Sequence, residues 1–268
     1  MILEKKWPKV GIIACTNGNE PIGLEMHRYV QDNITITAGS VHLIVANPEA
    51  QKINQRFVDY DMNRIWTDHE WWLKSCEHYR KEELKPLLWA CDIILDIHSV
   101  PIGDNVFGIS SFEDSESVQA WTDLEHILMR DCSKGWSLTG YYTRQWKVAV
   151  WLEIWNHKIT KESIEMWKRN VRNMLIYYGL VEWTISRKKV STVLCRKLET
   201  IYRESKDFTF QVKQDDGTCF YTINPGGIIA QDWEKTLLNT YDYPVVLFML
   251  SKHEGVKPAA GFLYQKIN

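Results

Sequence analysis

Short apolar runs alternate with longer amphipathic stretches from Lys9 to about Glu182, and this alternation constrains the fold more than any other feature. Four apolar runs predict strands buried on both faces, at Val10–Cys15, Val41–Ala46, Cys91–His98 and Val148–Trp155. Helices are expected between them, over Glu20–Asp32, Asp68–Trp89, Ser117–Asp131 and the stretch that follows Thr160. Strands that alternate with helices predict an α/β fold whose sheet is mixed and mostly parallel, flanked by helices.

Local signals mark some helix ends. Thr160 is a typical N-cap, and Gly179 is a typical residue just beyond a helix. Apolar residues recur between them at helical spacing, at Ile164, Trp167, Val171, Met174, Leu175 and Tyr178. Pro86 predicts a break in the Asp68–Trp89 helix before Leu87.

The pattern of apolar and polar residues changes after Trp183. Strand-like segments follow one another, at Arg187–Glu204, Phe208–Lys213, Cys219–Asn224, Tyr243–Ser251 and Gly261–Asn268. Turn signals such as Asp215-Asp216-Gly217 and Asn224-Pro225-Gly226-Gly227 separate them. We therefore expect an α/β catalytic domain over residues 1–183 and a small β-rich domain over residues 184–268.

Composition excludes several classes of protein. The 268 residues are 45% hydrophobic and 25% charged, which is ordinary for a globular chain. The net charge of -2 favours neither a nucleic acid nor a membrane surface as a partner. The chain shows no secretory leader, no membrane-spanning run and no C-x-x-C pair among its six cysteines, so a cytoplasmic protein with buried thiols is expected. The sequence leaves the oligomeric state, including a homo-oligomer, open.

Polar side chains follow the predicted strands at the points where the strands end. Glu20 comes after the first strand, His98 ends the third, and Glu153 lies near the end of the fourth. The loop after the second strand adds further polar residues, which are Asn47, Arg56, Asp59, Asp61, Asn63 and Arg64. Because the carboxyl ends of parallel strands meet at one sheet edge, these groups should gather into a site for an anionic substrate.

The residue types suit a metal-dependent hydrolase. Such an enzyme needs protein ligands with one open position, a carboxylate that takes a proton from water, and a cation that polarises a carbonyl. Glu20 and His98 could serve as ligands, Glu153 as the base and Arg56 as the polarising cation. Arg64 could clamp a substrate carboxylate in bidentate fashion.

The segments "CTNGNEPIG", "NPEA", "RFVDYDMNR", "LDIHS" and "WLEIW" resemble, in order and approximate spacing, those of the succinylglutamate desuccinylase/aspartoacylase family. The resemblance implies a zinc carboxypeptidase-like fold and hydrolysis of the amide of an N-acyl acidic amino acid. It implies one zinc ion per chain, held by Glu20 and His98, with Glu153 as general base and Arg56 as the carbonyl-polarising residue. It also implies that Asn63 and Arg64 bind the substrate carboxylate.

Asn17 departs from the family pattern, because it stands where the family has its first zinc-binding histidine. An amide oxygen is a weaker zinc ligand than an imidazole and suits harder cations better. Three outcomes stay open: Asn17 is a weak ligand, His157 takes its place, or the site holds no metal. The alternative function is a catalytically impaired relative that binds an anionic small molecule without zinc. A true carboxypeptidase is a third hypothesis, which the β-rich domain disfavours.

Four of the site residues also have a structural interpretation. Glu20 could be a first-turn helix acid, His98 a hydrogen-bonded buried histidine, and Arg56 and Arg64 loop arginines paired with Asp59 and Asp61. The other histidines are expected at the surface or on helix faces, at His27, His42, His69, His78, His126 and His253.

Overall fold

The computed structural model describes residues 7–67, 70–100, 106–111, 113–131, 136–156, 159–185, 192–212, 220–249 and 259–267. Its main feature is a sheet of ten strands in the order β2-β1-β3-β6-β4-β5-β7-β13-β12-β9. The α/β half supplies β1 (Lys9–Ala14), β2 (Ser40–Val45), β3 (Ile93–Val100), β4 (Val106–Ser110), β5 (His126–Met129) and β6 (Val148–Asn156). Strands β2, β1, β3 and β6 are parallel to one another, and β4 is antiparallel to β6. The predicted mixed, mostly parallel α/β fold is confirmed.

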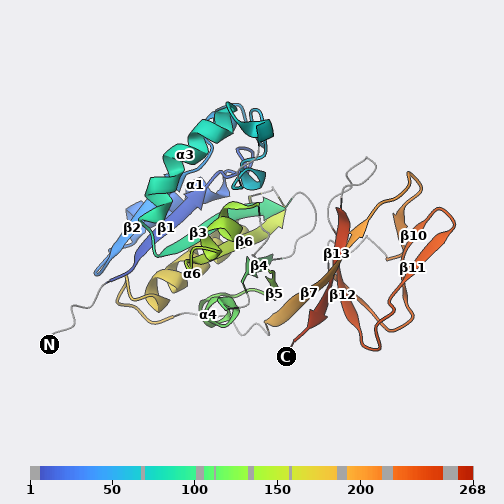
Figure 1. Cartoon of the computed structure of the whole chain (residues 1–268). Helices are drawn as coiled ribbons and strands as arrows, with labels where there is room; N and C mark the ends of the chain where they lie inside the picture. The colour runs from blue at the N-terminus through green and yellow to red at the C-terminus, as the bar shows by residue number, and fades with distance from the viewer. Residues whose placement is uncertain are drawn as a thin grey trace.

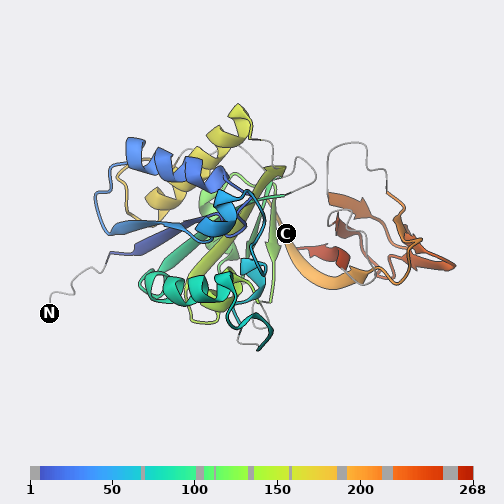
Figure 2. The same cartoon turned by 90° about the horizontal axis from the view of Figure 1, so that it is seen from above.

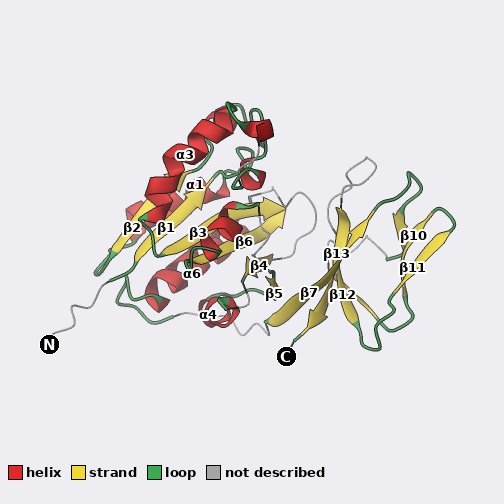
Figure 3. Ribbon diagram, viewed as in Figure 1, coloured by secondary structure: helices red, strands yellow, loops and turns green. Residues whose placement is uncertain are grey.

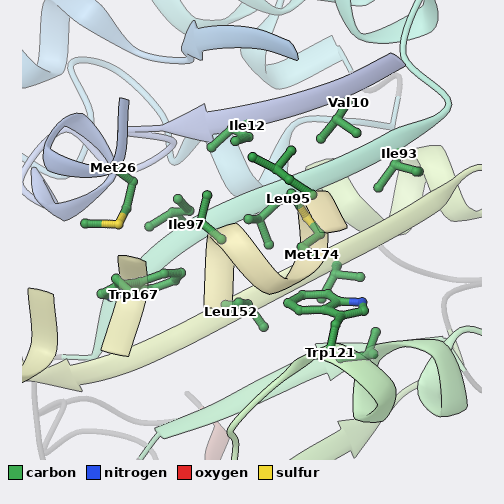
Figure 4. Close-up of a cluster of buried hydrophobic side chains, with 14 of the residues drawn as sticks. Val10, Ile12, Met26, Ile93, Leu95, Ile97, Trp121, Leu152, Trp167 and Met174 are labelled. Atoms are coloured by element: carbon green, nitrogen blue, oxygen red, sulfur yellow. The ribbon is translucent and has the colours of Figure 1, made fainter. Parts of the chain in front are cut away.

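Helices cover both faces of this sheet, as Figure 2 shows. They are α1 (Ile22–Asn33), α2 (Pro48–Lys52), α3 (Cys76–Trp89), α4 (Ser115–Trp121), α5 (Leu138–Thr143) and α6 (Lys161–Tyr177), with 3-10 turns η1 (Met62–Arg64) and η2 (Glu70–Trp72). Side chains of α1, α4 and α6 pack with alternate residues of β1, β3 and β6 into the largest buried cluster, part of which Figure 4 shows. Helices α3 and α5 contribute to a second cluster, on the other face.

The alternation of side chains along β3 decides where the polar site can lie. Ile93, Leu95 and Ile97 belong to the α1/α4/α6 cluster, whereas Ile94 belongs to the α3/α5 cluster. Successive strand residues face opposite sides, so Asp96 and His98 share the face of Ile94. The chemistry therefore lies on the α3/α5 face of the sheet, at the carboxyl ends of β3 and β6.

The C-terminal part, as far as the structure describes it, contains strands and no helix. Strands β7 (Val193–Tyr202), β13 (Ala259–Lys266), β12 (Val245–Met249) and β9 (Phe220–Ile223) extend the large sheet, and β11 (Lys235–Leu238), β10 (Ile228–Asp232) and β8 (Thr209–Phe210) form a second one. These strands form the orange and red group in Figure 1. The large sheet passes without interruption from β5 to β7, which pair in parallel. The division into domains at residue 184 stays a prediction.

Some expected elements are wrong in detail (Figure 3). The stretch Ser117–Asp131 is not one helix, because α4 ends at Trp121 and β5 begins at His126. Strand β5 pairs with β4 on one side and β7 on the other, and this pairing overrides the local helical pattern. Strand β4 was not expected at all. Pro86 lies inside α3, which continues to Trp89, so the predicted break before Leu87 is wrong.

The structure also tests the expected helix cap and the expected positions of a histidine and of the cysteines. Thr160 caps α6, as the sequence predicts, and the structure adds a reciprocal capping box with Ser163. His27 is buried rather than on the surface, with Nε2 placed 2.9 Å from the carbonyl oxygen of Ile12. Among the described cysteines, Cys15, Cys91 and Cys195 are free and buried and Cys76 is half-buried. In the described part of the chain, no helix is long and apolar enough to cross a membrane.

Candidate active site

The loop between β1 and α1 carries the first half of the site, and close backbone packing determines its shape. Cys15 opens the loop at φ 56, a left-handed conformation that a non-glycine residue rarely adopts. A Cβ atom on Gly18 would lie 2.3 Å from the Ala50 carbonyl carbon and 2.4 Å from the Gln51 nitrogen. The glycine of the Asn-Gly-Asn-Glu segment is therefore required by the close approach of the α2 backbone. This contact brings the two polar loops together.

Glu20 is the centre of the site and is only 2% exposed. Its Oε1 accepts a hydrogen bond from Asn17 Nδ2 at 2.8 Å and a longer one from Arg56 Nη1 at 3.5 Å. Its Oε2 lies 2.9 Å from His98 Nδ1 and accepts the backbone N–H of Ser99 at 3.1 Å. Burial raises the pKa of Glu20, but His98, Arg56 and the Ser99 amide outweigh it, so the pKa lies below its usual value. Glu20 is therefore ionised.

His98 lies between two carboxylates and is fully buried. Its Nδ1 faces Glu20, and its Nε2 lies 3.0 Å from Asp96 Oδ2, without hydrogen-bond alignment. Asp96 is itself oriented by Thr16, whose hydroxyl donates to Oδ1 at 2.7 Å. Burial lowers the pKa of His98, but the charges of Asp96 and Glu20 raise it well above its ordinary value.

The two contacts of His98 show that a positive charge belongs at this point. A neutral imidazole carries one proton, so it can donate to Asp96 or to Glu20 but not to both. The remaining nitrogen would then face a carboxylate oxygen with its lone pair. Either a second proton or a cation bound by His98 and Glu20 removes this repulsion.

Asn17 completes a tripod with Glu20 and His98. Its Nδ2 lies 2.8 Å from Glu20 Oε1 and 3.2 Å from His98 Nδ1. Ligands of a tetrahedral zinc ion stand about 3.3 Å apart, so the spacing is that of side chains around one cation. A half-turn of the amide would present Oδ1, which is buried and has no hydrogen-bond partner among the described residues. The tripod fits a divalent cation, held more weakly than by a set with two histidines.

The third position of the tripod is therefore an amide. In line with this, no cluster of three or more His, Cys, Asp and Glu side chains in the described ranges is arranged to hold a metal. His157, the sequence's alternative ligand, lies outside the described residues.

Glu153 lies directly beside His98, because the two residues are register partners on the parallel strands β6 and β3. It is 8% exposed, and its Oε2 has no hydrogen-bond partner among the described residues. Burial and the negative charge of Glu20 raise its pKa to about 8, against the opposing charges of His98 and Arg56. A carboxyl group with this pKa can accept and release a proton near neutral pH.

The segment Arg56–Arg64 brings the remaining predicted residues to the site. Arg56 bridges two carboxylates, since its Nε donates to Asp61 Oδ2 at 2.9 Å while Nη1 reaches Glu20. Asn63 is fully buried, and its Oδ1 accepts the backbone N–H of Leu138 at 3.0 Å. Its Nδ2 has no partner among the described residues. Arg64 is exposed and donates from Nη1 to the Asn63 carbonyl at 2.8 Å.

Two polar residues of the same region have structural roles instead. Asn47 caps α2 by accepting the backbone N–H of Ala50. Asp59 accepts the backbone N–H of Cys76 at 2.7 Å, which ties the loop to the start of α3. The expected pairing of an arginine with a loop acid is confirmed for Arg56 and Asp61.

The sequence did not single out three further residues, of which Asp96 and Trp151 lie beside His98 and Arg130 lies beside Trp151. Asp96 could have been found from the i, i+2 spacing in "LDIHS", which places both residues on one face of a strand. Trp151 lies against the His98 ring, with centroids 4.6 Å apart. Arg130, from the end of β5, lies 5.9 Å from the Trp151 ring centre and 5.2 Å from that of Phe262. No local sequence pattern marks Arg130, because only the pairing of strands in the sheet brings it near Trp151.

Solved structures share this architecture. A succinylglutamate desuccinylase from Vibrio cholerae superposes with a TM-score of 0.79 at 17% identity, over 98% of this chain and 82% of that one. Murine aminoacylase 3 gives a TM-score of 0.74 at 19% identity, over 99% of this chain and 97% of that one. The ectoine utilization protein EutE (DoeB) from Ruegeria pomeroyi gives a TM-score of 0.73 at 13% identity, over 98% of this chain and 86% of that one. At these identities the likeness establishes the fold.

The family is identified by comparing the sequence with models of known protein families. The model of the succinylglutamate desuccinylase/aspartoacylase catalytic domain matches residues 6–177, which is more than half of the chain. The protein belongs to this family of deacylases. A search of curated protein sequences found no match.

Proposed function

We propose that the protein is a metal-dependent amidohydrolase that cleaves the amide of an N-acyl acidic amino acid. The observation that carries the proposal is the convergence of Asn17, Glu20, His98 and Arg56, with Glu153 beside His98 at the same sheet edge. Glu20 and His98 would hold a divalent cation, with Asn17 as a weak third ligand. When bound, this cation supplies Lewis acidity to the site.

The arginines and Asn63 bind the substrate. Arg56 stands next to Glu20 and is 39% exposed, so its guanidinium can reach the acyl carbonyl and stabilise the negative charge that develops on its oxygen. Among the residues that the structure describes, the buried amide N–H of Asn63 has no hydrogen-bond partner, which suits a substrate carboxylate oxygen. Arg64 is exposed beside it and supplies the positive charge for that carboxylate.

Glu153 moves the proton. As a carboxylate it takes a proton from the attacking water, whose oxygen forms the new bond to the acyl carbon. It then gives this proton to the amine nitrogen as the amide bond breaks. The products are a carboxylic acid and a free amino acid, with atoms and charge in balance. The raised pKa of Glu153 suits this exchange at neutral pH.

Hydrolysis of N-acetyl-aspartate and N-succinyl-glutamate, in the presence of added Zn²⁺ or Mn²⁺, tests the proposal. We expect turnover by the native protein and a loss of about 100-fold or more in kcat for Glu153→Gln. Glu165→Gln is the matched control, because Glu165 is an exposed acid on α6 paired with Lys168. Equal activity of Glu153→Gln and the native protein would contradict the mechanism.

The second candidate function is an anion-binding relative without a metal. It is favoured by the contacts of Glu20, whose two oxygens already receive Asn17, Arg56, His98 and the Ser99 amide. A protonated His98 would then supply the positive charge. Metal analysis of the purified protein separates the two candidates. Binding of N-acetyl-aspartate with neither metal nor turnover would favour this second function.

A further inference from the structure

Helix α3 buries two opposite charges that the proposed mechanism does not use. Glu77 and Lys81 are both fully buried, and they begin a stripe that continues with Leu84 and Leu88. The spacing of four residues places them on the same side of the helix. Burying a charge is costly unless it is well paired, so the partners of these groups indicate what the helix holds.

The Glu77 carboxylate receives three consecutive backbone N–H groups of the neighbouring loop. Its Oε1 accepts from Val58 at 2.6 Å, and its Oε2 accepts from Asp59 and from Tyr60 at 3.1 Å each. Asn47 Nδ2 also donates to Oε1, at 3.1 Å. Successive amides directed at one carboxylate are oriented by it, much as a backbone nest is oriented around a bound anion.

Lys81 holds the other end of the same loop. Its Nζ donates to the carbonyl oxygen of Ile65 at 3.2 Å. The 3-10 turn η1 (Met62–Arg64) lies between the two attachment points. The loop also returns a bond to the helix, because Asp59 accepts the N–H of Cys76. The segment from Val58 to Ile65 is therefore attached to α3 at both ends.

The residues proposed to bind the substrate carboxylate lie inside this segment. Asn63 and Arg64 form η1, and Asp61 accepts the Asn63 backbone N–H at 2.9 Å as well as the Arg56 guanidinium. We infer that Glu77 is a positioning residue, assisted by Lys81, that sets the loop so that it recognises the substrate carboxylate. This inference rests on the proposed function of the same loop.

The test compares Glu77→Gln with Glu83→Gln. Glu83 lies on the same helix but is 65% exposed and pairs with Arg80, so the control loses the same charge without touching the loop. The first readout is the affinity for N-acetyl-aspartate by calorimetry, with KM and kcat wherever the native protein turns it over. We expect Glu77→Gln to weaken binding and raise KM about tenfold or more, and to lower kcat less. Bound metal should be unchanged, because Glu20 and His98 lie outside the segment.

A second readout does not depend on function. Hydrogen exchange of the Val58, Asp59 and Tyr60 amides should become faster in Glu77→Gln and stay native in Glu83→Gln. Unchanged exchange, or native affinity with faster exchange, would overturn the inference. If the native protein neither binds nor hydrolyses the compound, the proposed function fails, and the exchange result still decides whether the carboxylate holds the loop.

A further variant covers the case in which Glu77→Gln does not fold. Lys81→Met keeps an unbranched side chain one atom shorter than lysine, and it removes the bond to Ile65 together with the 3.5 Å ion pair with Glu82. It should also raise KM more than it lowers kcat, with the thermal transition cooperative and bound metal unchanged. A folded Lys81→Met protein with native KM would overturn the assisting role of Lys81.

Discussion

Substitution of Asn17 by histidine should convert a weak cation site into a strong one. Asn17 Nδ2 lies 2.8 Å from Glu20 Oε1 and 3.2 Å from His98 Nδ1, so a side chain at this position already borders both proposed ligands. The loop backbone need not move far, because Gly18 keeps it packed against the α2 backbone. Asn17→His exchanges an amide for an imidazole, which zinc prefers.

The expected gain in zinc-binding free energy can be estimated from zinc sites in other proteins. A structural zinc ion contributes about 12 kcal/mol of binding free energy over four ligands, or about 3 kcal/mol for each ligand. A tenfold change in affinity corresponds to about 1.4 kcal/mol. Asn17→His should therefore tighten zinc binding by a factor on the order of 100.

Competition with a chromophoric chelator would measure the zinc dissociation constants of both proteins at one pH. Asn33→His is the matched control, because it makes the same chemical change on an exposed residue at the end of α1. It should leave zinc affinity unchanged. If Asn17→His binds zinc no more tightly than the native protein, then Asn17, Glu20 and His98 do not form a ligand tripod, and the metal hypothesis is refuted.

Two further predictions concern stability. Burial and the charge of Lys266 lower the pKa of His126 to about 4, so below its ordinary pKa of 6.5 the unfolded chain binds more protons than the folded one. This residue alone should lower the free energy of unfolding by about 2 kcal/mol between pH 7 and pH 5, and urea denaturation of His126→Phe should show a correspondingly smaller loss. Gly18→Ala should destabilise the protein by about 2 kcal/mol or more through backbone overlap. Gly226 is at φ 73, so Gly226→Ala carries the strain of a left-handed backbone, but its Cβ atom meets nothing within 4 Å. It should therefore cost less than Gly18→Ala in thermal unfolding, and equal costs would contradict the close-packing argument.

The helices and strands that were predicted correctly are those with strong local signals. Helix α6 has both a cap and a regular apolar face, and β1 and β3 each contain a short apolar run. Strands β4 and β5 have five and four residues, and they exist because they pair with each other and with neighbours far away in the chain. No window of the sequence contains those partners, so local periodicity could not reveal them.

The candidate site shows the same division between residues that local sequence patterns reveal and residues that only the tertiary structure brings into place. Glu20, His98 and Glu153 could be placed together because they follow or end parallel strands, whose carboxyl ends share one edge of a sheet. Glu77 had no such signal, since an acid in a helical stretch is most often solvated. Its burial against three loop amides depends on how α3 packs, and that packing belongs to the tertiary structure.

The sequence by itself determined the class of fold, the kinds of side chain at the sheet edge, and the exchange of a family histidine for Asn17. It could do so because strand periodicity and residue type are local properties of the chain. Only the tertiary structure decided that the Asn17 amide stands within hydrogen-bond distance of both Glu20 and His98. It also decided that His98 lies between two carboxylates, a contact that requires a positive charge. Both contacts depend on the distances between segments that are far apart in the sequence, and only folding sets those distances.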